Sequence, residues 1–140
     1  MSINKQLIRE AVRRRVITAS GIDPLTQFQE ENKDFDPTGL NLWIAEYCIA
    51  GEETAITPRR SRISSFIMQY DIYAPLNSGT ENIDRAISAI CEEFDMADPD
   101  KSGLSIPGYS INLVSIKPEV DAGKNKQRQM LVLTFDITKS

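Results

Sequence analysis

Residues 61–94 constrain the fold of this chain most, because they combine a long strand, a short turn and an amphipathic helix. From Arg62 to Tyr73, apolar side chains alternate with mixed ones, which predicts a strand in a sheet that is covered on one side. After a Gly-containing turn, Thr80 is the predicted N-cap of a helix that ends near Phe94. The apolar stripe of this helix consists of Ile83, Ile87, Ile90 and Phe94. This block is predicted to build structure and carries no reactive constellation.

The other periodic segments predict one more helix and four more strands. The helix covers residues 3–19, with Ser2 as its N-cap and Gly21 as its stop. A turn at 50–53 separates the first two of these strands, and a polar hairpin loop at 119–128, entered through Pro118, separates the last two. The four strands are 40–49, 54–57, 109–117 and 129–138. The acidic, proline-bearing segment 23–39 keeps no period and is predicted to be a loop or a partly ordered crossing segment.

Length and element order predict one domain over residues 1–140. Strands that are joined in pairs by turns indicate a mainly antiparallel sheet. The predicted fold class is therefore α+β: a two-layer sandwich of a mainly antiparallel four- to five-stranded sheet with two main helices packed on one face.

Composition argues against catalysis. The chain contains no histidine, which is the commonest general base and a frequent metal ligand. Its two cysteines, Cys48 and Cys91, lie in apolar runs and are predicted to be free, buried side chains. Phosphate-binding glycine loops and zinc motifs are absent from the sequence, and Lys101 follows the aspartates of 95–100 where a calcium loop would need ligands. We therefore expect no enzyme, no cofactor and no metal.

The N-terminal residues lack the apolar core of a secretory signal, and no apolar run is long enough to span a membrane, which favours a mature cytosolic start. Charge is segregated along the chain. Residues 1–22 carry five basic side chains and one acidic one, whereas residues 23–57 carry eight acidic side chains and one basic one. Such patches suit subunits that meet head to tail. The acidic balance favours protein contacts over nucleic acid for the arginines. The candidate subunit or tube interface residues are Arg13, Arg14, Arg59, Arg60, Glu30, Glu31, Asp34, Lys124 and Lys126.

One further pattern lies in residues 41–94, and the N-terminal helix and the closing strand pair of 109–138 fit the same layout, so that it spans nearly the whole chain. Trp43 lies in a strand after the acidic loop, and the strand pair that follows turns at Pro58-Arg59-Arg60. The long strand closes with Y-x-x-Y-A-P at 70–75, and a loop with Gly79 leads to the helix stripe of 86–94. In this pattern the chain resembles the tail terminator family of long-tailed bacteriophages, together with related small tail-completion proteins.

The resemblance implies a structural virion protein without catalytic residues. Such a subunit forms a homo-oligomer, expected to be a hexameric ring through which DNA can pass. The ring caps the tail tube, ends its polymerisation and provides the surface joined to the head or neck. Its expected partners are the major tail tube protein and the neck or head-completion proteins, with no membrane and no specific nucleic acid. Its expected location is the head-proximal end of the virion tail, after assembly in the host cytoplasm. Two alternatives stay open: a head–tail joining (neck) protein of similar fold, and a small cytosolic enzyme or nucleic-acid-binding module.

Overall fold

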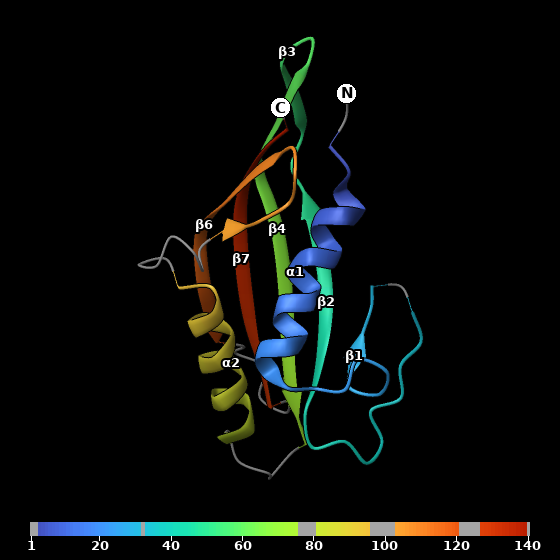
Figure 1. Ribbon diagram of the computed structural model, residues 1–140. Coiled ribbons are helices and arrows are strands. Elements are labelled where there is room, and N and C mark those ends of the chain that lie inside the picture. Colours follow the sequence, from blue (N-terminus) through green and yellow to red (C-terminus); the bar gives the residue numbers. More distant parts are fainter. Residues whose placement is uncertain (1–2, 32, 76–80, 96–102, 121–126, 140) are drawn as a thin grey trace.

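The computed structural model describes residues 3–31, 33–75, 81–95, 103–120 and 127–139 (Figure 1). In chain order the elements are α1 (Lys5–Ser20), β1 (Phe28–Gln29), β2 (Trp43–Ala50), β3 (Glu53–Thr57), β4 (Arg60–Ala74), α2 (Glu81–Glu93), β5 (Gly103–Leu104), β6 (Tyr109–Val120) and β7 (Gln127–Lys139).

Two layers make up the molecule: an open sheet and two helices that pack side by side on one of its faces (Figure 1). Six strands follow the order β1-β2-β4-β7-β6-β5, and β3 pairs with β4 beside this path. All pairings are antiparallel except that of β1 with β2. The predicted α+β sandwich is confirmed. The predicted strand count was too low, because β1 and β5 are two residues long and show no alternation in the sequence.

The core lies between the helices and the sheet, where the predicted patterns place it. The α2 stripe is buried throughout, and so are Phe66, Met68, Tyr70 and Ile72 on β4. β7 adds Leu131, Leu133, Phe135 and Ile137, and α1 adds Ile8, Val12 and Val16. Cys48 and Cys91 are free and half-buried against this core. In both cysteines, burial raises the pKa of the thiol.

The structure moves two of the predicted boundaries and confirms a third. Asn4, not Ser2, caps α1: its side chain accepts a hydrogen bond of 3.1 Å from the Leu7 N–H. Pro118 does not stop β6, which continues to Val120 because no described strand pairs with the outer side of β6 there. Gly21 is confirmed as the helix stop, with a left-handed φ of 73°. The predicted cap Thr80 lies outside the described residues.

The turn predicted at 50–53 is an interruption within one long strand. β3 continues in the direction of β2, and both pair with the same partner, β4, so that β2 and β3 form one arm of a long hairpin. At the break, the Gly51 N–H donates a 2.7 Å hydrogen bond to the Ser65 carbonyl oxygen. A Cβ atom at position 51 would lie 2.6 Å from that oxygen. Gly51 therefore permits a close backbone approach and does not turn the chain.

We expect Gly51→Ala to lower the free energy of unfolding by about 2 kcal/mol, because the added methyl group forces two backbone segments apart. Urea denaturation followed by circular dichroism measures this loss. Ala55→Ser, an equally small change at an exposed position of β3, is the control and should stay within about 0.5 kcal/mol. Equal stability of the two variants would show that the break between β2 and β3 tolerates a side chain.

Candidate functional site

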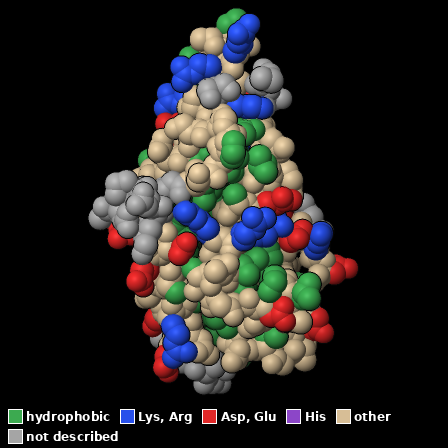
Figure 2. Space-filling model, in the orientation of Figure 1, with side chains coloured by type: hydrophobic (Ala, Val, Ile, Leu, Met, Phe, Trp, Pro, Cys, Tyr) green, Lys and Arg blue, Asp and Glu red, His purple; other side chains and the backbone are tan. Residues whose placement is uncertain are grey.

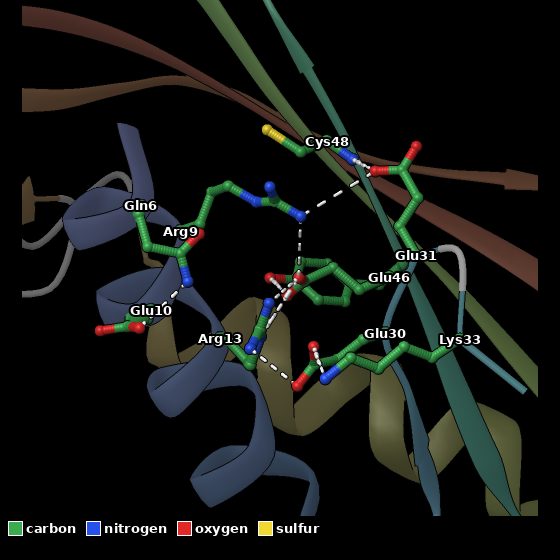
Figure 3. A network of polar contacts seen from close by, with 10 residues as sticks. Gln6, Arg9, Glu10, Arg13, Glu30, Glu31, Lys33, Glu46 and Cys48 are labelled. Atoms are coloured by element: carbon green, nitrogen blue, oxygen red, sulfur yellow. Dashed lines mark hydrogen bonds and ion pairs between the residues drawn. The ribbon is translucent and has the colours of Figure 1, made fainter. Parts of the chain in front are cut away.

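A charged network joins α1 to the sheet, and its centre is the carboxylate of Glu46, which has 0% of its surface exposed (Figure 3). Arg13 donates from Nη2 to Oε1 at 2.6 Å and from Nε to both carboxylate oxygens at 3.1 Å. The Tyr70 hydroxyl donates to Oε2 at 2.9 Å. Burial of a carboxylate is costly unless it is paired and hydrogen-bonded, and both conditions are met here.

The local folding of two elements explains this meeting. Glu46 lies between Ile44 and Cys48 on the face of β2 that the helices cover, and it is directly opposite Tyr70 on β4. Arg9 and Arg13 are one helical turn apart, so both lie on the side of α1 that faces β2 (Figure 3). Burial, and then the neighbouring Glu46 charge, raises the pKa of Tyr70 well above its usual value, which keeps the phenol protonated as a donor. The hydrogen bond to Glu46 raises the pKa of Arg13.

An outer shell extends the network to the segment after β1. Arg13 Nη1 lies 3.3 Å from Glu30, and Lys33 lies 2.9 Å from the same carboxylate. The hydrogen bond from Lys33 lowers the pKa of Glu30. Arg9 Nη2 lies 3.9 Å from Glu31, which also accepts the Cys48 N–H at 3.3 Å. The positive charges of Arg9, Arg13 and Lys33 thus balance the carboxylates of Glu30, Glu31 and Glu46. The network holds the segment after β1 along the edge of β2.

The network changes the interpretation of the segregated charges. Arg13 on α1 is directed at the sheet, since only 16% of its side chain is exposed. Three predicted interface residues, Arg13, Glu30 and Glu31, form ion pairs within the chain. The complementarity of the two segments is therefore used at least partly inside one subunit. Sequence reasoning missed Glu46, although a lone acid between apolar strand residues was a usable signal.

The remaining candidates are distributed over separate places. Arg14 is exposed and lines an open hollow of about 390 Å³, together with Glu10, Arg13, Ile17, Thr18 and Pro24. Asp34 is exposed in the loop from β1 to β2. Lys124 and Lys126 lie outside the described residues. The structure thus brings Arg13 together with Glu30 and leaves Arg14 and Asp34 apart from the network.

Arg59 and Arg60 lie at the tip of the hairpin formed by β3 and β4. Both side chains are exposed, as are those of Ile56, Thr57 and Pro58. Within the part of the chain that the structure describes, neither arginine forms an ion pair, whereas nearby Arg62 binds Asp136 through two contacts of 2.8 and 3.0 Å. Figure 2 shows Lys and Arg side chains gathered toward this end of the molecule. The tip is therefore a projecting basic surface with free hydrogen-bond donors.

A second surface is the face of the sheet opposite the helices, on which Trp43 and Tyr73 are half-buried. There the Trp43 and Tyr73 rings stack with centroids 5.6 Å apart, and the Arg128 guanidinium lies 6.0 Å from the Tyr73 ring centre. Arg128 is also 3.6 Å from Asp71, which has only 3% of its surface exposed. Ile49, on the same face of β2, is 58% exposed. Aromatic and aliphatic groups on a face that no described helix covers are typical of an association surface.

Among the described residues, no group of three or more His, Cys, Asp or Glu side chains is placed to hold a metal ion. No described helix is long and apolar enough to cross a membrane. The charged groups of the network are paired with one another, so the arrangement is suited to holding α1, β1 and β2 together.

Comparison with known proteins identifies the fold. The class is α+β, with two helices packed on an open, mostly antiparallel sheet. One solved structure, whose name states no function, is similar to this protein with a TM-score of 0.63 and 17% sequence identity. The match covers 97% of this chain and 96% of the chain in that structure. No protein-family model and no curated protein matches the chain. At this level of identity the likeness establishes the fold alone.

Proposed function

We propose that this protein is a structural subunit of a bacteriophage virion that caps the tail tube, ends its polymerisation and provides the surface joined to the head or neck. In this role it acts as a homo-oligomeric ring of six subunits at the head-proximal end of the tail, not as an enzyme. The resemblance to tail terminators in residues 41–94 and the agreement of the observed fold with that layout support the proposal.

The observation that carries the proposal is the presence of two different surfaces on one subunit. A basic hairpin tip projects at one end, and an aromatic face lies opposite the helices. A ring with cyclic symmetry needs two unlike patches on each subunit, because every contact joins one patch to the other. A subunit that also contacts the tail tube and the neck needs additional contact surfaces beside those that join it to its neighbours in the ring.

Tail tubes assembled from the major tail protein provide the test. We expect the purified protein to appear in negative-stain electron micrographs as a ring at one end of each tube, and added tail protein should then no longer lengthen the tubes. Tubes in buffer alone, which continue to grow, are the control. Tubes that lengthen unchanged in the presence of a protein that does not bind their ends would refute the proposal. Binding to the connector at the head instead would indicate the neck role.

A further inference from the structure

Among the exposed charges that form no ion pair within the described part of the chain are two groups of opposite sign. Arg59 and Arg60 form the exposed hairpin tip, and Asp34 and Asp36 are exposed in the loop from β1 to β2. The backbone N–H of Thr38 binds Asp36 at 3.0 Å, and hydrogen bonding to Thr38 lowers the pKa of that carboxyl, which keeps it ionised. Both groups are therefore available to bind a partner of opposite charge.

Within one subunit, the tip and the loop lie too far apart to neutralise each other. Glu31, three residues before Asp34, contacts the Cys48 backbone at 3.3 Å. Thr57, at the base of the tip, lies nine residues after Cys48 along β2 and β3. Nine residues of extended chain span roughly 30 Å. Exposed charges are screened beyond about 10 Å at ordinary ionic strength. The tip and the loop are separate patches at different places on one elongated body (Figure 1).

We propose that the Arg59–Arg60 tip of one protomer binds the Asp34–Asp36 loop of a second copy of this chain. The inference names a contact by which the proposed ring closes, and so it rests on the proposed function. Arg presents a planar fork of donors that matches a carboxylate, and two such pairs specify both the partner and the register. Because the tip and the loop are different patches, the contact is head to tail and repeats around an assembly.

The acidic partner of the Arg59–Arg60 tip is a protein surface, because the same chain carries a loop of complementary charge. The tip presents two arginines without a described aromatic side chain beside them for stacking on bases. The overall charge of −4 also opposes approach to phosphates. Nucleic acid as the partner of the tip is an outcome that the experiment distinguishes.

The test uses two charge-reversed variants of the whole chain, Arg59→Glu with Arg60→Glu, and Asp34→Lys with Asp36→Lys. Sedimentation velocity gives the assembly size of each variant alone and of their equimolar mixture. Each variant alone should associate at least about tenfold more weakly than the natural chain, because its tip and loop then have the same sign. The mixture should recover assembly, since the acidic tip of one variant meets the basic loop of the other.

Arg85→Glu, a charge change at an exposed position of α2, is the control and should leave assembly unchanged. A natural chain that stays monomeric, or a mixture that stays as dissociated as its components, overturns the inference. So does a tip variant that loses binding to a fluorescent duplex DNA oligonucleotide without recovery of assembly in the mixture. The tail-tube test is separate: rings that form through this contact but do not cap tubes would sink the proposed function and leave the contact standing.

Discussion

Replacing Arg13 with methionine should lower the free energy of unfolding by about 3 kcal/mol, because the carboxylate of Glu46 stays buried without its main partner. Removal of one member of a buried pair costs about 3–5 kcal/mol in other proteins. The lower end applies here for two reasons. Arg9 lies 4.0 Å from the same carboxylate and offers a partial substitute, and the Tyr70 hydroxyl bond remains. Urea or thermal denaturation at neutral pH measures the loss.

Arg14→Met is the matched control, since it makes the same change at the next position of α1, where the side chain is exposed. Its effect should stay within about 0.5 kcal/mol. The double variant Arg13→Met with Glu46→Gln should recover at least half of the loss, because a neutral amide costs less to bury and still accepts from Tyr70. Equal stability of the Arg13 and Arg14 variants would mean that water or Arg9 fully replaces Arg13 as the partner of the Glu46 carboxylate.

Phe94→Ala is expected to cost about 3–4 kcal/mol, the range for loss of a fully buried aromatic ring. Phe94 follows the last turn of α2 and has 0% of its surface exposed. Its ring meets that of Phe135 edge to face at 6.2 Å, and the Arg15 guanidinium lies 5.5 Å from its centre. The side chain thus fastens the end of α2 to both α1 and β7. Chemical denaturation gives the change in stability.

Leu25→Ala provides the control for Phe94, because it also shortens an apolar side chain but at a position that is 90% exposed. It should change stability by less than about 0.5 kcal/mol. Hydrogen exchange adds a local measurement: the amides of α2 should exchange faster than those of β4 in the Phe94 variant. A loss no larger than that of Leu25→Ala would contradict the anchoring role of the ring.

Strong periodicity explains why most of the fold was predictable. The alternation in β4 and the stripe of α2 are long enough for the residue pattern alone to indicate element type, buried face and layer order. β1 and β5 carry too few residues for a pattern. Gly51 was misinterpreted for a different reason, because a glycine in a turn and a glycine in a close backbone approach look the same in sequence.

The charged residues were harder to interpret than the apolar ones. Sequence showed the excess of base in residues 1–22 and of acid in residues 23–57, and it favoured contacts between subunits. The structure pairs Arg9 and Arg13 with acids of the same chain instead, and it leaves Arg59, Arg60 and Asp34 exposed. Charged side chains follow no regular spacing along this sequence. Their ion-pair partners therefore depend on which elements pack together.

The sequence by itself determined the two layers, the covered sheet face and the identity of the core, because burial of apolar surface follows local periodicity. Only the tertiary structure decided that Glu46 lies inside under Arg13 and Tyr70, and that the tip of the β3–β4 hairpin projects with free arginines. The physical reason is range: periodic burial is encoded within a few residues, whereas an ion pair joins residues 33 positions apart that meet only when α1 packs on β2.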